Sequence, residues 1–278
     1  MISPEELRAL RSDTQIIIDL GYKSVAHPTD YRVKPDPETG EDVFHRVQFV
    51  FPLATTDPNP MIALLGHPAM LAVVRAILGD DLLCNAEALV FKLPGNGSEV
   101  LVHADCDPAD TRSSDEHIGF NIDFYLDDAT PENGCLLVVP GSHKRHYSAK
   151  EITAKGFDFP ELRPVLMKAG DVLIHNIDLV HGSHKNSGDR LRRTLYYEFQ
   201  SLRWMFEEGI RPELRADEPW AKKRIRLMLH AIETRKACTY AARETPFEYR
   251  VPEGWKVEPH STADPVELRT KMTSSTNL

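Results

Sequence analysis

The chain has 278 residues, 41% of them hydrophobic and 27% charged, which is typical of a globular protein with a sizeable core. Its 33 basic and 42 acidic residues give a formal net charge of −9, which argues against nucleic acid or an anionic membrane as a partner. No apolar run is long enough to span a membrane, and the N-terminus lacks a signal-peptide pattern, so we expect a cytoplasmic protein. Four cysteines without CxxC spacing predict neither a disulfide framework nor structural zinc.

The first 80 residues are expected to be mainly helical. Ser3-Pro4-Glu5-Glu6 has the pattern of a capping box, and the helix that it opens should run to about Leu20. Residues 22–43 are rich in proline and polar side chains, which predicts an exposed loop, either a lid over a site or a plain surface excursion. Helical spacing resumes over residues 61–65 and 68–78, and Gly79 is a natural stop.

From residue 82 to 200 the pattern changes to short β-rich runs between turn signals. The predicted strands are 82–93, 100–104, 117–126, 135–139, 164–167, 172–175 and 191–200. Many short strands at this spacing are typical of a sandwich or jelly roll rather than of alternating βαβ units. A further helix is predicted over 217–243, with an apolar stripe that would cover the sheet, followed by a polar and flexible tail over 258–278. We expect a single domain over residues 1–278.

The first candidate metal ligands are His103 and Asp105, at the end of a predicted strand. Residues two apart on a strand point to the same face, so the imidazole and the carboxylate can reach one point. The pair precedes a turn-rich loop over residues 107–115, where a site would be open to substrate. Two ligands do not hold a metal, so a third is required.

Three histidines, His175, His181 and His184, could supply the third ligand. His175 ends an apolar strand and fits a structural role, whereas His184 lies in a polar loop. His181 ends the next apolar run and is followed by the small residues Gly182 and Ser183, so we choose His181. Two histidines and one carboxylate on one face leave other metal positions open, which suits non-haem Fe(II) and its reactions with O2.

A possible anion site follows the third histidine. Arg192 begins the strand 191–200, and Ser183 lies two residues after His181. A guanidinium group and a hydroxyl can together grip a carboxylate. The alternative is that Arg192 belongs to a solvent-facing basic cluster with Arg190 and Arg193.

The complete pattern resembles the phytanoyl-CoA dioxygenase family of Fe(II)/2-oxoglutarate-dependent oxygenases over about residues 60–200. The matching motifs, in chain order, are Lys92-Leu93-Pro94-Gly95, His103 and Asp105, Leu126-Asp127-Asp128, the segment Glu132 to Lys144 with its Pro140-Gly141-Ser142-His143-Lys144 turn, Gly170-Asp171, His181-Gly182-Ser183, Asn186 and Arg192. The turn and the spacing from His181 to Arg192 make the resemblance specific.

The resemblance implies a fold, a cofactor and a reaction. The fold would be mainly β with flanking α-helices, a double-stranded β-helix or cupin-like jelly roll. His103, Asp105 and His181 would hold Fe(II) as the catalytic metal centre. Arg192 and Ser183 would bind the distal carboxylate of 2-oxoglutarate, which reacts with O2 to give succinate and CO2 while the substrate is hydroxylated.

Two positions depart from the family pattern. Ala104 stands between the metal ligands where the family often has Gln, and Asp123 stands where an aromatic residue is frequent. Both leave the metal set intact but argue against a bulky acyl-CoA substrate. Because Asp105 is a carboxylate, the pattern also argues against the halogenating relatives, which have a small residue there.

Strand parity selects candidate substrate-binding residues. Asn121, Asp123 and Tyr125 share the face that would look into the barrel, and Asp107 and Arg112 lie on the loop after the metal ligands. Each of these residues could instead orient a metal ligand or lie at the surface. An interior with Asn and Asp favours a small polar substrate, for example one that bears an amine.

The sequence therefore predicts an Fe(II)/2-oxoglutarate-dependent dioxygenase that hydroxylates a small polar metabolite or natural-product intermediate. The same chemistry could instead give desaturation, epimerisation or ring closure. An alternative of another class is a cupin-like protein that binds a metal or ligand without turnover. The expected partner is a small-molecule substrate, with no nucleic acid or membrane partner, and the expected oligomeric state is a monomer or homodimer.

Overall fold

The computed structural model describes residues 2–23, 31–35, 40, 42–48, 56–95, 97–105, 119–145, 147–206 and 218–257. The helices of this part are α1 (Pro4–Lys23), α2 (Pro60–Leu65), α3 (Pro68–Leu78), α4 (Ala149–Lys155) and α5 (Glu218–Lys236). The strands are β1 (Tyr31–Pro35), β2 (Asp42–Gln48), β3 (Leu82–Lys92), β4 (Val100–His103), β5 (Phe120–Tyr125), β6 (Leu136–Val138), β7 (Arg163–Val165), β8 (Val172–Asn176), β9 (His181–Ser183) and β10 (Arg192–Ser201).

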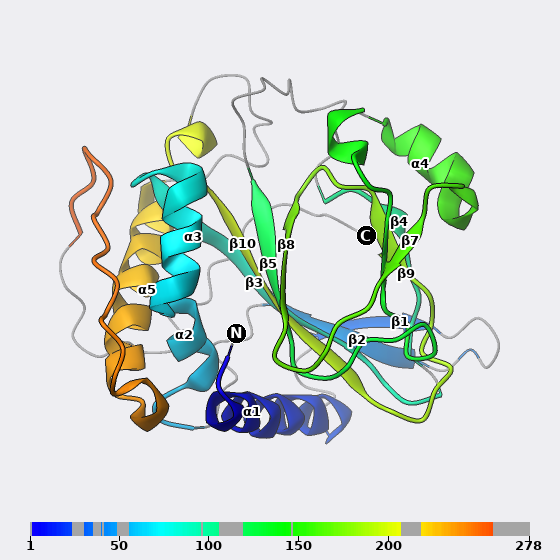
Figure 1. Ribbon diagram of the computed structural model, residues 1–278, viewed down its shortest axis with the longest axis horizontal. Coiled ribbons are helices and arrows are strands. Elements are labelled where there is room, and N and C mark those ends of the chain that lie inside the picture. The colour runs from blue at the N-terminus through cyan, green and yellow to red at the C-terminus, as the bar shows by residue number, and fades with distance from the viewer. Residues whose placement is uncertain are drawn as a thin grey trace.

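The strands form two antiparallel sheets that face each other. The large sheet has the order β1-β2-β3-β10-β5-β8, and the small sheet has the order β4-β9-β6-β7. In Figure 1, α2, α3 and α5 cover the outer side of the large sheet, and α4 lies beside the small sheet. This arrangement is the jelly roll with flanking helices that the family resemblance implied, and it is one of the two folds that the strand pattern predicted.

Most predicted elements are found within a few residues, with three differences. The range 22–43, expected to be a loop, contains β1 and the first residues of β2, which pair with each other. The local composition of residues 22–43 did not reveal these strands, because each strand is stabilised by pairing with the other rather than by its own sequence pattern. The last helix, predicted over 217–243, ends at Lys236, and a short 3-10 turn follows. Helix α4 and the three-residue strand β9 were not predicted. The tail 258–278 and most of the proposed lid lie outside the described residues.

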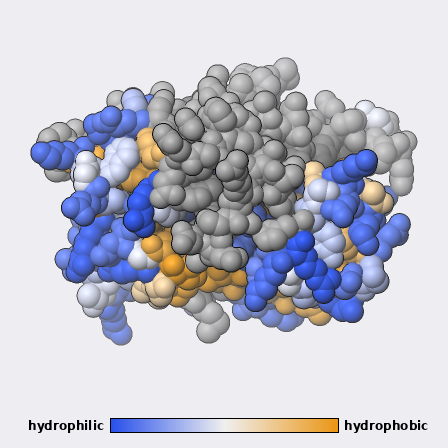
Figure 2. Space-filling model, turned by 90° about the horizontal axis from the view of Figure 1, so that it is seen from above, coloured by the Kyte–Doolittle hydropathy of each residue, from blue (hydrophilic) through white to orange (hydrophobic). Residues whose placement is uncertain are grey.

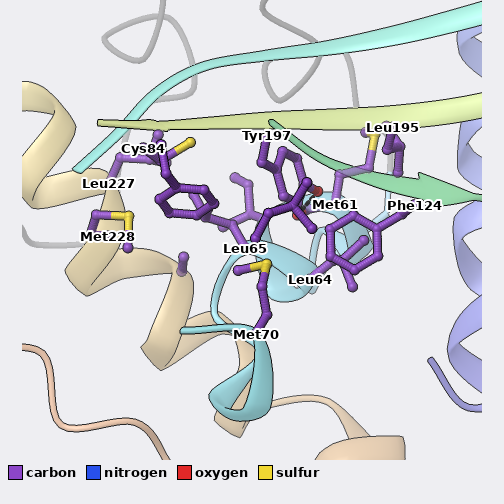
Figure 3. Packing of buried hydrophobic residues seen from close by; sticks show 14 of the residues in the cluster. Met61, Leu64, Leu65, Met70, Cys84, Phe124, Leu195, Tyr197, Leu227 and Met228 are labelled. Carbon is purple, nitrogen blue, oxygen red and sulfur yellow. Dashed lines mark hydrogen bonds between the residues drawn. The ribbon is translucent and has the colours of Figure 1, made fainter. Parts of the chain in front are cut away.

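The main core lies between the large sheet and the helices. Figure 3 shows Met61, Leu64 and Leu65 of α2 packed toward Leu195 and Tyr197 of β10. The buried Tyr197 hydroxyl donates a hydrogen bond of 2.7 Å to the backbone carbonyl of Met61, so the only polar atom of this side chain is paired. Alternate residues of β10 therefore anchor the sheet to the helices and leave the remaining residues facing the second sheet.

The described surface has a mixed character. Figure 2 shows hydrophilic residues over both ends of one face and hydrophobic residues near its middle. Among the described residues, no helix is long and apolar enough to cross a membrane.

One ion pair is buried where α5 packs on the sheet. The Arg224 guanidinium lies 2.7 Å from the Glu87 carboxylate of β3, and both side chains are at most 2% exposed. Arg224 also donates through Nε to the carbonyl of Cys84 at 2.7 Å. Loss of either partner would leave an uncompensated charge in the core, so this pair fixes how α5 sits on β3.

We predict that Arg224→Ala lowers the free energy of unfolding by about 3 to 5 kcal/mol, because Glu87 would remain buried without its cation. Lys222→Ala is the matched control on the same helix, since Lys222 pairs with Glu218 at the surface, and its cost should stay below about 1 kcal/mol. Urea unfolding followed by circular dichroism measures both. Equal losses for the two variants would contradict the importance of the buried pair.

Candidate metal centre

Two histidines are brought together by the pairing of β4 with β9 in the small sheet. His103 and His181 lie directly opposite each other in this antiparallel pair, and their ring centroids are 4.4 Å apart. Gly182 allows the close approach, because a Cβ there would lie 3.0 Å from the Val100 carbonyl oxygen and the Val102 Cα. A backbone requirement next to His181 therefore helps to set the distance between the two imidazoles.

Both imidazoles are oriented by backbone carbonyls. Nδ1 of His103 lies 2.7 Å from the Leu101 oxygen, and Nδ1 of His181 lies 2.8 Å from the Leu179 oxygen. A carbonyl oxygen only accepts, so each Nδ1 carries the proton and each Nε2 keeps a free lone pair. Imidazoles that bind metals are commonly held in this way.

The third group is the carboxylate of Asp105. One of its oxygens lies 3.5 Å from Nε2 of His103, and the other lies 3.9 Å from Nε2 of His181. The candidate ligand atoms of the three residues all lie within 4.8 Å of one another. The second oxygen also accepts a hydrogen bond of 2.8 Å from the Asn121 amide of β5. These contacts give the carboxylate a fixed direction toward the two imidazoles.

The protonation states suit a metal site. Burial lowers the pKa of His181 to about 3, so its imidazole is neutral at pH 7. The Nε2 atoms of the two histidines and the Asp105 carboxylate can therefore bind a cation together.

A second His/Asp pair lies behind the centre. His175 of β8 packs its ring 5.0 Å from that of His181, and its Nε2 lies 3.2 Å from the Asp123 carboxylate. Burial alone would lower the pKa of His175, but Asp123 outweighs it and raises that pKa to about 9. His175 is thus a cation paired with Asp123, which agrees with a structural role, and the pair supports the ring of His181 from behind.

The predicted anion-binding arginine lies inside the barrel. Arg192 is 1% exposed, so it does not belong to a solvent-facing basic cluster, whereas Arg190 is exposed. One terminal nitrogen of Arg192 donates to the carbonyl of Gly134, and its Nε is buried and has no hydrogen bond to the residues that the structure describes. Arg193 points the other way and binds Asp127 at 2.8 Å. The strand alternation therefore separates the two adjacent arginines.

Ser183 lies on the facing sheet, close to the residue that pairs with Arg192. Lys92 of β3 is directly opposite Arg192, and its ammonium donates to the carbonyls of Ser98, Ser183 and His184. The Ser183 side chain is buried, with the residue 2% exposed. Lys92 thereby joins the two sheets at the end of the barrel where Arg192 lies.

The remaining predicted site residues fall into two groups. Tyr125 lies opposite Thr194 on the interior face, and the hydroxyl groups of both are buried without a hydrogen bond among the described residues. Asn121 and Asp123 face the metal ligands and their supporting histidine, as given above. Asp107, Arg112 and Cys106 lie outside the described residues. The contacts of Asn121 and of the His175–Asp123 pair could not be read from the sequence, since cross-strand register creates them.

Ala104 also has a defined place. It lies between the two ligands in sequence and packs against the second hydrophobic cluster, which includes Val102, Val139 and Val180. Its side chain therefore belongs to the packing layer beneath α4 rather than to the polar interior. The departure from the family pattern at this position leaves the three candidate ligands in place.

The comparison with known families agrees with this geometry. The family model described as phytanoyl-CoA dioxygenase (PhyH) matches residues 1–194. The chain belongs to the phytanoyl-CoA dioxygenase family. The match includes all three candidate metal ligands and Arg192, and it confirms the resemblance stated from the motifs.

Individual relatives share about half of the chain. The dioxygenase lolE1 of Epichloe uncinata is 34% identical over 143 residues, which are 49% of this chain and 53% of the relative. The methylphosphonate hydroxylase of Gimesia maris is 31% identical over 147 residues, 51% of this chain and 54% of the relative. The chain thus spans about half the length of the curated relatives that it matches.

Solved structures confirm the fold class. AviO1 from Streptomyces viridochromogenes Tue57 superimposes with a TM-score of 0.60 at 27% identity, over 76% of this chain and 88% of that chain. The chain and AviO1 therefore share the mainly β jelly roll with flanking helices.

We predict that Asn121→Ala weakens Mn²⁺ binding by about 10- to 100-fold, because Asp105 loses the hydrogen bond that fixes its direction. Asn59→Ala is the control, since Asn59 caps the N-terminus of α2 and makes no contact with the candidate ligands in its capping role. Its loss should lower the free energy of unfolding by about 1 kcal/mol and leave the metal affinity unchanged. Isothermal titration with MnCl2 measures the dissociation constants. Unchanged affinity in Asn121→Ala would show that Asn121 does not support the metal ligand.

Proposed function

We propose that this protein is an Fe(II)/2-oxoglutarate-dependent dioxygenase that hydroxylates a small polar metabolite or natural-product intermediate. The observation that carries the proposal is the convergence of three ligand atoms within 4.8 Å, in a barrel that also buries an arginine with an unpaired Nε. Membership of a dioxygenase family supports the class of reaction. The substrate and the outcome of oxidation are part of the proposal. The cytoplasmic location and the oligomeric state stay predictions.

The donor set fits Fe(II). Two imidazole nitrogens and one carboxylate oxygen would supply three ligands and leave other metal positions for cosubstrate and O2. His103, Asp105 and His181 would hold the ion, while Leu101, Leu179 and Asn121 fix their directions. Bound Fe(II) with 2-oxoglutarate supplies activation of O2, coupled to conversion of the cosubstrate to succinate and CO2.

The interior also fits a dicarboxylate cosubstrate. The buried Nε of Arg192 and the buried hydroxyls of Tyr125 and Thr194 have no hydrogen bond in the described part of the chain. Buried donors that lack an acceptor cost about 1 to 3 kcal/mol each, so a ligand carboxylate would be stabilised here. Ser183 is also buried and adds a further hydroxyl from the facing sheet. This site would take the distal carboxylate of 2-oxoglutarate.

The protein side of the reaction consists of positioning and exclusion of water. Arg192 would fix the cosubstrate at its distal end, and the buried His175–Asp123 pair keeps the ring of His181 in place. The apolar residues of β10 and the helices close the outer side of the sheet, so water does not reach the centre through that side. Asn121, Asp123 and Tyr125 stay candidates for substrate contacts, as do Asp107 and Arg112.

The first test concerns the metal and its third ligand. Anaerobic addition of Fe(II) and then 2-oxoglutarate to the protein should produce the weak visible charge-transfer band of the chelate. We predict that His181→Ala abolishes the band, since the metal would lose one of three protein ligands. His184→Ala is the matched control: His184 is an exposed histidine three residues away, with its ring against Phe157. A wild-type protein that binds iron without a band favours the alternative of a cupin-like binding protein.

The second test concerns the cosubstrate. We predict that Arg192→Ala raises the 2-oxoglutarate concentration needed for half of the band by about 10- to 100-fold, because a buried charge-assisted hydrogen bond is lost. Arg190→Ala removes an exposed arginine two residues earlier and should leave this concentration unchanged. If both variants bind 2-oxoglutarate like the wild type, Arg192 does not hold the cosubstrate.

A further inference from the structure

A second carboxylate, that of Glu198, faces the barrel interior close to the metal centre. Glu198 alternates on β10 with Tyr197 and Phe199, which belong to the core beneath the helices. In the pairing with β5 it lies directly opposite Asn121, whose amide binds the Asp105 carboxylate. Opposite residues have Cβ atoms about 5 Å apart, so Glu198 is one cross-strand neighbour away from a residue that touches a metal ligand.

Within the described part of the chain, hydrogen bonds reach only one oxygen of Glu198. Oε1 accepts hydrogen bonds from the side-chain amides of Asn85 and Gln200. Among the described residues, no group donates a hydrogen bond to Oε2, and no basic side chain forms an ion pair with this carboxylate. Glu198 as a residue is partly exposed rather than buried. Two amides therefore fix the orientation of the carboxylate and leave one oxygen available.

A second acceptor lies beside the first. Asn85 is 7% exposed, and its Oδ1 is buried without a hydrogen bond from any described residue, while its amide nitrogen is directed to Glu198. A buried acceptor without a donor is costly. The Glu198 carboxylate cannot donate a hydrogen bond to Asn85 Oδ1, and the Gln200 amide is directed to Glu198 instead. The pair of acceptors, one of them anionic, matches a group that carries a positive charge and at least two N–H bonds.

The surroundings leave room for such a group. Ala86 and Ala88 of β3 lie opposite Glu198 and Tyr196 of β10, so this part of the interior face carries small side chains. Burial raises the pKa of Glu198, and Asp105 adds to this, while the two amides act in the opposite direction. Arg46 of β2 is the described cation that acts on Glu198, and it makes no ion pair with it. A cationic ligand would offset the cost of burying this charge.

We propose that Glu198 and Asn85 determine substrate specificity by binding a cationic nitrogen group, an ammonium or a guanidinium, of the molecule that is oxidised. Gln200 positions the carboxylate. The inference rests on the proposed function, because it treats the bound group as part of the substrate. It narrows the predicted small polar substrate to a compound that carries such a group.

The test uses four small probes: butylammonium, butylguanidinium, butyramide and butyrate. Their dissociation constants are measured with the full chain by ligand-observed NMR. We expect the wild type to bind at least one of the two cations about tenfold more tightly than butyramide and butyrate, and the better cation distinguishes an ammonium site from a guanidinium site. Loading the protein with Mn²⁺ should broaden the signals of the bound cation, which places it near the metal centre.

Two variants and a control locate the binding to Glu198. Glu198→Gln should weaken binding of the preferred cation about tenfold or more, and Asn85→Ala should weaken it several-fold while keeping the carboxylate. Glu233→Gln makes the same change of charge at an exposed position of α5 and should have no effect. Equal wild-type affinity for all four probes, or unchanged cation affinity in both site variants, would overturn the inference. If Glu198→Gln does not fold, the preference of the wild type for cations over butyramide and butyrate still tests the inference.

The same preparations separate this inference from the proposed function. The charge-transfer band with Fe(II) and 2-oxoglutarate tests the dioxygenase, and the probes test the cation site. A band without cation preference leaves the dioxygenase intact and rejects the role of Glu198. Cation binding without a band supports the site and rejects the proposed function.

Discussion

The alternation of side chains along the central strand β10 is the constraint on which both the core and the site depend. β10 pairs with β3 on one side and β5 on the other, so it cannot shift without breaking two registers. Leu195, Tyr197 and Phe199 face the helices, and Arg192 and Glu198 face the second sheet. A slip of one residue would exchange these two faces and bring charged side chains into the apolar core. The free energy of burying the aromatic residues thus also fixes the polar residues of the site.

The barrel interior contains many buried polar side chains, so these groups must find partners. Asp105 has Asn121, His175 has Asp123, and the Lys92 ammonium is surrounded by three carbonyls. The described part of this interior also contains buried atoms without a hydrogen bond, among them Arg192 Nε, Tyr125 Oη, Thr194 Oγ1 and Asn85 Oδ1. Such atoms are rare in protein interiors and cost free energy, so their concentration in one barrel indicates places where ligands bind. The chemistry of these atoms differs by position. Arg192 Nε and the two hydroxyls can donate hydrogen bonds, whereas Asn85 Oδ1, beside Glu198, can only accept one.

The sequence predicted the strand content, the ligand set and the family because these depend on local spacing. His103 and Asp105 are two residues apart, and His181 is followed by glycine, so the pattern is visible without a structure. It did not predict β9, since three residues carry no periodicity, nor the strands within 22–43, whose pairing is not local. The roles of Asn121 and Glu198 depend on their register opposite each other, which strand parity alone does not give. Parity identified the correct interior face but not which residues meet on it.

The charges of the interior explain why a cation site is expected beside an anion site. His175 and Asp123 balance each other, and the Lys92 ammonium is satisfied by carbonyls. Arg46, at the β2 end of the same face, acts on Glu198 through its charge and has a further interaction of its own. Of the described groups that face the metal centre, Arg192 carries a positive charge, while Asp105 and Glu198 carry negative charges. A divalent metal would be balanced by Asp105 and the chelating carboxylate of 2-oxoglutarate, and Arg192 would be balanced by the distal carboxylate, so Glu198 would keep a negative charge with no ion-pair partner among the described residues. Because a partly buried carboxylate without an ion-pair partner is unfavourable, a ligand that carries a positive charge matches this position best.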